Sequence, residues 1–472
     1  MAPQNARRRV ALFPVTRTAG PIGAFPVFAF SLSPAPALSL PSCSTPYSPR
    51  LALFMCLHES LRLLDVLRQL GAQSGSEFAG FKSWTATASP AKCATYLGVT
   101  CDAAGNVVAI NVTGAGLKGP IDALSKLAAL ESLDLSQNGE ITELPQSLAQ
   151  LKKLKLLNVN NCWIGGRIPP FLGQLTALTS LSIGGNPLVG AVPFSFGSLV
   201  NLVSLNIAAT GIEGVGGALP SSLSSLTKLK ELYLRKNRFK GPLPAFLGTF
   251  TDLEQLVVST NYWSGSIPVA LSNLKKLKNL GLRETTLEGE IPTFLGTLSQ
   301  LTYLSLSDTR LYGELPRALN GLANLRELYL QNGWFYGPLP DLTGLKKLTQ
   351  IDLSENYFSG PLPSFLRQVK QVNADSNYFS GSAAVLPCSD LFSVNGNCLS
   401  SVPSQCGGPS GQKTPAECSK FCGTGAAGGA CSGKGVCVPD MQKMQSSQAF
   451  VPVCKCAAGF LPTQNKLGCV KK

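Results

Sequence analysis

Apolar and polar residues alternate in short blocks, and these blocks recur at a fixed interval along most of the chain. The first apolar position of each block falls at Leu133, Leu157, Leu181, Leu205, Leu232, Leu256, Leu280, Leu304 and Leu328. The step is 24 residues throughout, except for the 27 residues between Leu205 and Leu232. A fixed period of this length predicts a solenoid of stacked coils, which offers an extended face rather than a closed pocket.

One unit, residues 232–244, shows which element each part of the repeat predicts. Leu232 and Leu234 alternate with exposed positions, which indicates a short strand with one buried face. Asn237 stands where the chain leaves the strand, and an inward amide there can bond backbone groups that would otherwise be buried and unpaired. The unit ends in Gly-x-hydrophobic-Pro, where glycine permits unusual backbone angles and proline opens a helical turn. Each coil is therefore predicted to be a strand, a turn and a short convex helix.

The asparagine position forms a ladder along the coils, but asparagine does not fill every rung. It stands there at Asn138, Asn186, Asn237, Asn261, Asn356 and Asn377. Other coils have Cys162, Thr210, Thr285, Thr309 and Gly333 at the same position. The ladder is therefore incomplete, and we expect Cys162 to be a buried free thiol.

The pattern Leu-x-Leu-x-x-Asn-x-Leu-x-Gly-x-Ile-Pro resembles the plant-type extracellular leucine-rich repeat. The resemblance covers residues 59 to about 386, and it implies an α/β solenoid, a right-handed superhelix of about twelve coils. Ile110 and Val112 begin the series, and Ile351 and Val372 continue it with shorter steps. An open solenoid would expose its core at both ends, so capping units are expected there.

Cysteines accompany both predicted caps. An amphipathic helix pattern precedes Cys93 and Cys101, whose surroundings resemble the family's N-terminal cap, although Tyr96 replaces the usual tryptophan. The resemblance implies a disulfide between Cys93 and Cys101. The downstream cap contains Cys388, Cys398, Cys406 and Cys418. Their pairing stays open, because four cysteines allow three connectivities.

The last six cysteines resemble the closing half of an EGF-like module. They are Cys422, Cys431, Cys437, Cys454, Cys456 and Cys469. The resemblance implies the pairs Cys422–Cys437, Cys431–Cys454 and Cys456–Cys469. So small a segment has little core and depends on such bridges, which each contribute roughly 2–4 kcal/mol. A zinc site is the weaker alternative, because paired Cys-x-x-Cys knuckles and nearby histidine are lacking; no calcium is expected either.

These assignments divide the chain into five segments. They are a leader or misassigned start (1–58), an N-terminal cysteine cap (59–106), the solenoid (107–386), a C-terminal cysteine-rich cap (387–420) and the EGF-like module (421–472). The leader is rich in arginine and has no acidic residue, as in a plastid transit peptide. The 15 cysteines favour a secreted or cell-wall protein instead, and this is the location we predict. No apolar run of about 20 residues predicts a transmembrane span.

The chain has 472 residues and a formal net charge of +14. The positive charge is spread over the coils rather than gathered into a basic run, so a nucleic-acid partner is not indicated. A basic extracellular protein would be drawn by charge to an acidic cell-wall polysaccharide such as demethylated pectin, although solubility alone also accounts for the charge. One sequon, Asn111-Val-Thr113, places an exposed asparagine where a glycan can attach.

The only histidine, His58, lies in or beside the leader. The rest of the chain therefore lacks the histidine that a Ser-His-Asp or Cys-His catalytic site requires. No phosphate-binding loop or kinase motif appears. We therefore predict no catalytic residue, no metal ligand and no cofactor, and we expect the activity to be binding.

Strand positions between the inward leucines point to the concave face, and their character changes along the chain. Early coils present small polar groups, whereas later coils present Tyr and Arg, the residue types that dominate interface energetics. The predicted ligand patch is Tyr233, Arg235, Lys236, Arg283, Glu284, Tyr329 and Gln331. A second exposed set follows the ladder position: Tyr262, Trp334, Tyr357 and Tyr378. The last three are predicted to form a lateral aromatic ridge. A solvated concave surface and ordinary edge packing are the alternatives.

The sequence resembles the ectodomain of plant receptor-like kinases and receptor-like proteins. This resemblance implies an extracellular recognition protein that binds a peptide or protein ligand, with a receptor-kinase co-receptor as a further partner. Polygalacturonase-inhibiting proteins are built from the same repeat, so a soluble inhibitor of a polysaccharide-degrading enzyme is one alternative. A pectin-binding wall protein is another. The predicted patch begins at the one break in register, between Leu205 and Leu232.

Overall fold

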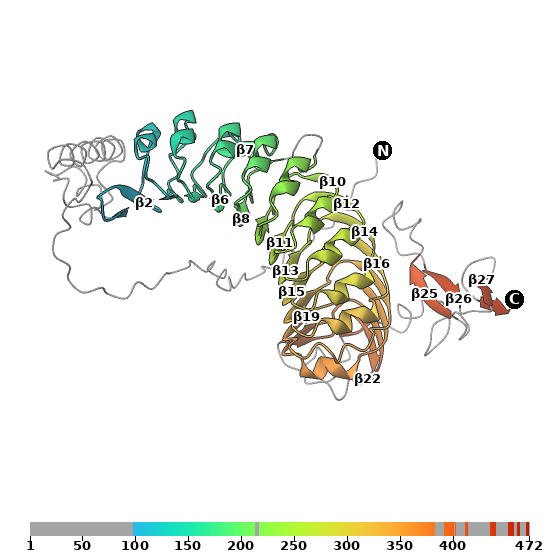
Figure 1. The fold of residues 1–472 in the computed structure, drawn as a ribbon. Helices are drawn as coiled ribbons and strands as arrows, with labels where there is room; N and C mark the ends of the chain where they lie inside the picture. The colour runs from blue at the N-terminus through green and yellow to red at the C-terminus, as the bar shows by residue number, and fades with distance from the viewer. Residues whose placement is uncertain are drawn as a thin grey trace, which may run out of the picture. The chain divides into compact units, whose positions relative to one another are not determined.

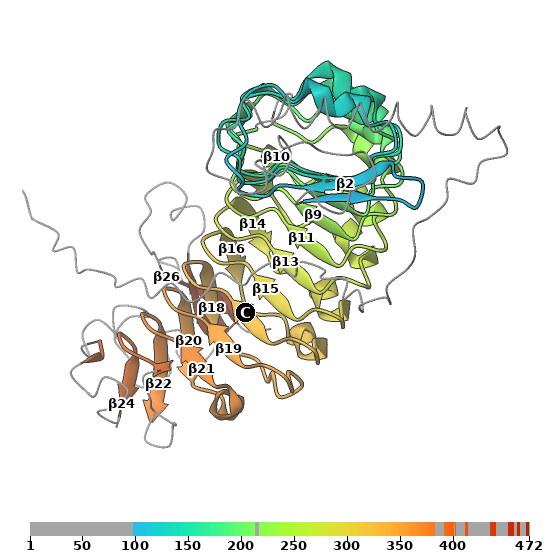
Figure 2. The same cartoon turned by 90° about the vertical axis from the view of Figure 1, so that its left-hand side faces the viewer.

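The computed structural model describes residues 98–212, 217–382, 391–400, 402 and 411–413, together with the backbone of four strands between residues 435 and 471. Successive coils stack on one another and each adds a strand to one long sheet, as the fixed period predicts (Figure 1). Figure 2 shows these coils one behind another. The predicted solenoid is therefore confirmed.

The long sheet has 14 strands within the described residues. In spatial order they are β1 (Val99–Cys101), β2 (Val107–Asn111), β3 (Ser132–Asp134), β4 (Leu156–Asn158), β6 (Ser180–Ser182), β8 (Ser204–Asn206), β9 (Glu231–Tyr233), β11 (Gln255–Val257), β13 (Asn279–Gly281), β15 (Tyr303–Ser305), β17 (Glu327–Tyr329), β19 (Gln350–Asp352), β21 (Gln371–Asn373) and β23 (Phe392–Ser393). The pair β1–β2 is antiparallel, and the later pairs are parallel. The first leucine of each coil lies opposite that of the next, including Leu205 opposite Leu232. The hydrophobic period thus sets the register, because a shift of one residue would expose every inward leucine.

A second parallel sheet runs beside the first, and the sequence pattern did not predict it. Its strands are β10 (Lys240–Pro242), β12 (Tyr262–Gly265), β14 (Thr286–Glu290), β16 (Arg310–Gly313), β18 (Trp334–Gly337), β20 (Tyr357–Pro361), β22 (Tyr378–Ser382) and β24 (Cys398–Ser400). Two earlier strands, β5 (Gly166–Arg167) and β7 (Leu188–Val189), form a separate two-stranded sheet within the described residues. The sheet is interrupted where the coil has three extra residues. There the carbonyl oxygens of Ile212 and Gly217 accept the N–H groups of Arg238 and Lys240 at 2.8 and 2.7 Å, which occupies the edge of β10.

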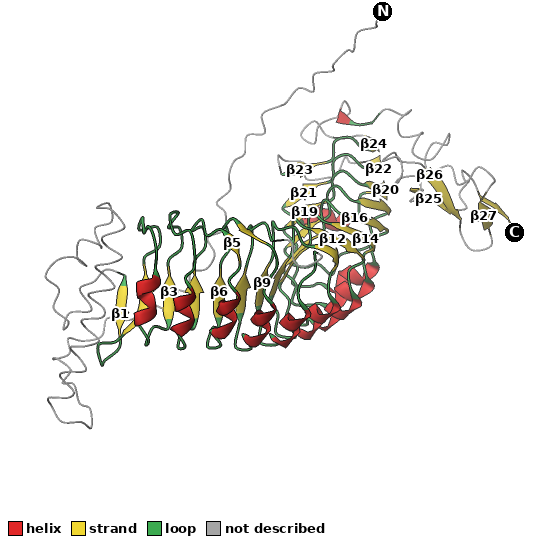
Figure 3. Cartoon of the chain, turned by 90° about the horizontal axis from the view of Figure 1, so that it is seen from above, coloured by secondary structure: helices red, strands yellow, loops and turns green. Residues whose placement is uncertain are grey.

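Short 3₁₀-helices cover the side of the coils opposite the long sheet (Figure 3). They are η2 (Asp122–Lys126), η3 (Gln146–Gln150), η4 (Pro170–Gln174), η5 (Phe194–Ser198), η6 (Ser221–Ser225), η7 (Ala245–Thr249), η8 (Val269–Asn273), η9 (Thr293–Thr297), η10 (Arg317–Gly321) and η11 (Ser364–Gln368). An extended proline, such as Pro244 or Pro268, precedes most of them, which confirms the predicted Gly-x-hydrophobic-Pro turn into a convex helix. Among the described residues, no helix has the length and apolar character needed to cross a membrane.

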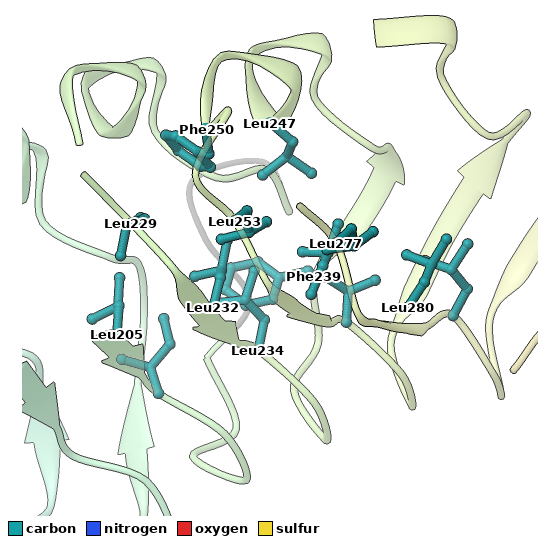
Figure 4. Packing of buried hydrophobic residues seen from close by; sticks show 14 of the residues in the cluster. Leu205, Leu229, Leu232, Leu234, Phe239, Leu247, Phe250, Leu253, Leu277 and Leu280 are labelled. Carbon is teal, nitrogen blue, oxygen red and sulfur yellow. The ribbon is translucent and has the colours of Figure 1, made fainter. Parts of the chain in front are cut away.

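The core lies between the long sheet and the helices (Figure 4). In the coil of β9, Leu232 comes from the strand and Leu234 directly follows it, while Leu247 and Leu253 come from the helix and the segment after it, and all four are buried. A column of larger side chains follows the ladder position. Phe239 stacks on Trp263 with ring centroids 5.3 Å apart. Phe335, Phe358 and Phe379 stack in the same way, which confirms that these three are core residues.

The asparagine ladder forms as predicted. Asn186 shows the full set of ladder bonds: its Oδ1 accepts the N–H groups of Cys162 and Ile164 at 2.9 and 3.0 Å, and its Nδ2 donates to the carbonyl oxygens of Val159 and Ile183 at 2.8 Å each. Threonines replace only part of this network, since each donates its hydroxyl to the carbonyl three residues earlier. The Cys162 thiol is free and buried, as predicted, and burial raises its pKa to about 11.

The asparagine ladder continues past residue 386, which is the predicted end of the solenoid. Asn397 is buried and donates Nδ2 to the carbonyl oxygens of Ala374 and Val394 at 2.9 Å each. Phe392 and Val394 are buried like the paired leucines of earlier coils. The signal Phe-x-Val-x-x-Asn was present, but it comes only 20 residues after Val372 and falls in the segment assigned to the cap.

Several predicted features lie wholly or partly outside the described residues. Cys101 and Cys398 are both disulfide-bonded. The expected partner of Cys101, Cys93, is outside the described residues, as are the leader and the remaining cap cysteines. Near the end of the chain, β25 (Gly435–Pro439) pairs antiparallel with β26 (Pro452–Cys456), and β27 (Phe460–Pro462) with β28 (Cys469–Lys471). The disulfide pairs of the caps and of the EGF-like module stay predictions.

Gly296 in η9 provides a test of how closely the convex helices pack. A Cβ atom there would overlap the carbonyl oxygen of Ala318 in the next helix. We expect Gly296→Ala to lower the free energy of unfolding by about 1–3 kcal/mol, because the two coils must move apart. Gly165→Ala is the control, since a Cβ there meets nothing within 4 Å, and its effect should stay within about 0.5 kcal/mol. Equal losses for the two variants in urea denaturation would contradict the packing argument.

Candidate ligand-binding face

The fold places the predicted ligand patch on the concave face of five consecutive strands. Tyr233 ends β9 and Tyr329 ends β17, and each side chain points away from the buried leucines on either side of it. The two tyrosines lie four strand spacings apart, which corresponds to roughly 19 Å at about 4.8 Å for each spacing. The patch is therefore an extended surface rather than a single cluster of side chains.

Both tyrosines are half-buried and lie beside acidic residues. Burial, and then the nearby Glu231, raise the pKa of Tyr233 to about 12. Tyr329 donates its hydroxyl to Oε2 of Glu327 at 3.0 Å, and burial, followed by the charge of Glu327, raises the pKa of Tyr329 above its ordinary value. The ring of Tyr329 also packs against Tyr303, with centroids 5.5 Å apart. Tyr303 was not predicted as a site residue, because it precedes the inward leucine instead of following it.

The concave face carries small side chains between the two tyrosines and, within the described residues, two unpaired acceptors at Asn279 and Gln331. Gly281 and Ser305 hold the positions equivalent to Tyr233, and both are buried. Two buried amide oxygens, Asn279 Oδ1 and Gln331 Oε1, have no hydrogen-bond partner among the described residues. An unpaired buried acceptor costs roughly 1–3 kcal/mol, so a ligand donor at either oxygen would recover stabilisation that the free protein lacks.

The charged residues of the patch differ in whether their side chains already form ion pairs or hydrogen bonds within the described residues. Nη2 of Arg283 lies 2.9 Å from Oε1 of Glu284. The second carboxylate oxygen of Glu284 accepts the hydroxyl of Thr260 at 2.9 Å. The ion pair is solvent-exposed, so it contributes little to stability. Arg235 and Lys236 are both exposed at the strand end. The side chains left to attract an anionic group are therefore Arg235 and Lys236.

A hollow of about 330 Å³ lies beside the patch, where the concave strands turn towards the second sheet. Its lining residues are Gly211, Lys236, Asn237, Arg238, Thr260, Asn261, Tyr262 and Glu284. The predicted patch contributes Lys236 and Glu284, whereas Arg238 and Thr260 were not predicted. No signal in the linear repeat joins them, because they come from successive coils and meet only through the stacking.

Two residues of the predicted lateral aromatic ridge lie against each other. Tyr357 and Tyr378 stack with ring centroids 6.3 Å apart, and Nζ of Lys413 lies 4.3 Å from the centroid of Tyr378. The strand register places Tyr357 opposite Tyr336, two residues along from Trp334. The same two-residue offset places Tyr378 opposite Ser359, so the three aromatic residues hold the same position in successive coils, and the ridge of all three stays a prediction.

The sequon lies on the concave face of the first coil. Asn111 is exposed at the end of β2 and pairs in register with Asp134. Its Oδ1 accepts the backbone N–H and the hydroxyl of Thr113 at 3.2 and 3.0 Å. A glycan attached to Asn111 would therefore stand over the first coils, away from the ligand patch. Its presence stays a prediction.

Three coils match the model of the family described as Leucine Rich Repeat, at residues 153–175, 228–250 and 347–369. The solenoid is a leucine-rich repeat domain. Receptor-like protein kinase 7 of Arabidopsis thaliana is 33% identical over 106 residues, which are 22% of this chain and 11% of that protein.

Two solved structures resemble this leucine-rich repeat domain. The ectodomain of the plant membrane receptor kinase GASSHO1/SCHENGEN3 from Arabidopsis thaliana is 31% identical with a TM-score of 0.60, covering 72% of this chain and 44% of that chain. The plant peptide hormone receptor RGFR1 is 25% identical with a TM-score of 0.52, covering 62% of this chain and 52% of that chain. The domain is related to the ectodomains of plant receptor-like kinases, and this chain spans less than half of the GASSHO1/SCHENGEN3 ectodomain.

Proposed function

We propose that this protein is an extracellular recognition protein whose leucine-rich repeat domain binds a peptide or protein ligand on its concave face. The observation that carries the proposal is the surface between β9 and β17. There half-buried tyrosines flank small residues, and the buried amide oxygens of Asn279 and Gln331 lack hydrogen-bond partners within the described part of the chain. Tyr and Arg are the side chains that contribute most at interfaces, and unpaired buried acceptors favour a ligand with N–H or O–H donors.

The relatives support binding of this kind. The GASSHO1/SCHENGEN3 ectodomain was crystallised in complex with CASPARIAN STRIP INTEGRITY FACTOR 2, and RGFR1 was solved in complex with RGF2. Leucine-rich repeat ectodomains of this type are binding domains, so we propose no catalytic step for this chain. Because the chain spans only part of these relatives, its own ligand and a receptor-kinase co-receptor are proposals.

The side chains have distinct roles in this proposal. Tyr233 and Tyr329 present ring surface at the two ends of the patch, and both are restrained by burial. Arg235 offers an exposed cation in the same coil as Tyr233. Gln331 accepts a hydrogen bond from the ligand through its unpaired Oε1. An extended peptide fits this arrangement, since its backbone N–H groups are regularly spaced donors.

The test replaces Tyr233, Arg235 and Tyr329 together with alanine. We expect the triple variant to bind a peptide ligand selected from a library of secreted plant peptides at least 100-fold more weakly than the unaltered chain, as hot-spot side chains each contribute about 2 kcal/mol. Isothermal titration calorimetry provides the dissociation constants. RGF2 and CASPARIAN STRIP INTEGRITY FACTOR 2 belong in the library as first probes.

The matched control changes the same strand position in early coils, Asn158, Ser182 and Asn206, to alanine. These side chains are small and polar, so their loss should alter the affinity less than about threefold. Unchanged affinity in a correctly folded Tyr233, Arg235, Tyr329 triple variant would rule out this face as the binding site.

We also propose that residues 421–472 form an EGF-like module in an extracellular protein. The antiparallel pairs β25–β26 and β27–β28 support this assignment, because short two-stranded sheets held by disulfides are typical of small secreted domains. Within β25–β26 the register sets Cys437 opposite Cys454. Mass spectrometry of the non-reduced, protease-digested protein tests the three predicted disulfide pairs.

A further inference from the structure

The hollow beside the concave face is lined by residues that hold equivalent positions in successive coils. Lys236, Thr260 and Glu284 follow β9, β11 and β13, and all three have left-handed backbones with φ of 57°, 56° and 53°. This shared turn holds their side chains in a row along successive coils. Arg238 and Tyr262 stand two residues further along each coil. Gly211 also lines the hollow and contributes no side chain to it.

The hollow carries free positive charge. The Lys236 ammonium and the Arg238 guanidinium have no hydrogen bond or ion pair within the described residues. The Glu284 carboxylate is engaged by Arg283 and Thr260. The amides of Asn237 and Asn261 are also committed, since their Oδ1 atoms accept backbone N–H groups in the ladder. Two cationic donors thus face a space whose one carboxylate is already neutralised, which favours an anionic ligand.

The exposed ring of Tyr262 indicates a second property of the ligand. Tyr262 is 58% exposed, so its ring is accessible at the edge of the hollow. A tyrosine ring beside cations fits a ligand that has a flat apolar face as well as a negative charge. A volume of about 330 Å³ is at the lower end of the range for small-molecule sites. A single peptide carboxylate would satisfy the cations but leave the ring and most of the space unused.

We propose that this hollow binds a uronate residue of an acidic polysaccharide. Arg238 holds the sugar carboxylate through its two-pronged guanidinium, Lys236 adds a second positive charge, and Tyr262 lies against the C–H face of the ring. The net charge of +14 attracts a polyanion to the protein as a whole, and the hollow determines where one sugar residue docks. The site is distinct from the peptide-binding face proposed above, although Lys236 and Glu284 border both.

The test uses trigalacturonate as the probe and the full chain as the protein. One double variant combines Arg238→Gln with Tyr262→Ala, neither of which belongs to the concave patch. The matched control combines Arg310→Gln with Trp163→Ala. Arg310 and Trp163 occupy the same position of other coils, outside the hollow, and Trp163 is 69% exposed. Both pairs lose one charge and one exposed aromatic ring, so diffuse attraction to the protein falls equally in both.

We expect the Arg238, Tyr262 variant to bind trigalacturonate at least tenfold more weakly in calorimetry, and the control less than twofold. A conservative pair, Arg238→Lys with Tyr262→Phe, should retain most of the affinity, which excludes loss through misfolding. The concave triple variant should bind trigalacturonate like the unaltered chain, so the two proposals fail independently. Equal weakening in the test and control pairs, or no binding to the unaltered chain at millimolar trigalacturonate, overturns the proposal. Equally tight binding of triglutamate also overturns it, because the site would then recognise a peptide carboxylate.

Discussion

Replacing Asn186 with alanine is expected to lower the free energy of unfolding by about 3–5 kcal/mol, since a net contribution near 1 kcal/mol is typical for each hydrogen bond lost. The amide bonds the backbone N–H groups of Cys162 and Ile164 and the carbonyl oxygens of Val159 and Ile183. All of these groups are buried, so alanine would leave them without partners and without water. Urea denaturation followed by circular dichroism measures the loss.

Two further variants test whether the ladder is the cause. Asn201 is partly exposed and donates to the carbonyl oxygen of Thr176 at 3.1 Å, so Asn201→Ala should cost less than about 1 kcal/mol. Asn186→Thr should be intermediate, because the threonine of another coil, Thr210, keeps one bond to the carbonyl three residues earlier. A loss for Asn186→Ala as small as that for Asn201→Ala would show that the ladder bonds do not hold the coils together.

Replacing Phe358 with alanine is expected to cost about 3–5 kcal/mol, the range for truncating a large buried aromatic side chain. Phe358 lies between Phe335 and Phe379, with ring centroids 6.2 and 6.0 Å away, and none of the three rings is exposed. The cavity would separate neighbouring coils. Because each coil of a solenoid contacts only its neighbours, the coils after Phe358 should lose protection first. Hydrogen exchange of backbone amides measures that local loss.

The controls for Phe358 use the same residue type and the same column. Phe194 is 69% exposed at the start of η5, so Phe194→Ala should change stability by less than about 0.5 kcal/mol. Phe358→Leu should cost less than Phe358→Ala, since Leu287 and Leu311 fill the equivalent position in earlier coils. Uniform loss of protection along the whole solenoid after Phe358→Ala would contradict the neighbour-only coupling.

Much of the scaffold could be predicted from the sequence because each coil repeats the same local requirements. Leu232 and Leu234 indicate a strand with one buried face, Asn237 indicates the turn, and the proline before η7 indicates the convex helix. The second sheet gave no such signal. Its strands pair through backbone groups between coils, so residues such as Ser264 and Gly265 need no apolar alternation there. The last coil, at Phe392, was missed because its step is shorter than the others.

The candidate face could be predicted only as a set of outward positions. The pattern placed Tyr233 and Tyr329 on the concave surface, because residues beside inward leucines must point outward. It did not show that Glu327 binds the hydroxyl of Tyr329 or that Glu284 is already paired with Arg283. These contacts involve side-chain conformations that the repeat leaves free, and they decide which groups remain available to a ligand.

By itself, the sequence determined the solenoid, its register and the residues of its core, because burial of a period-2 strand and of its ladder amide is a local requirement repeated in every coil. The tertiary structure alone decided the hollow lined by Lys236, Arg238 and Tyr262, and the gap in the second sheet beside it. Such features arise where side chains of different coils meet. Their positions depend on the stacking of coils and on the three extra residues after Leu205, and neither is encoded within a single repeat.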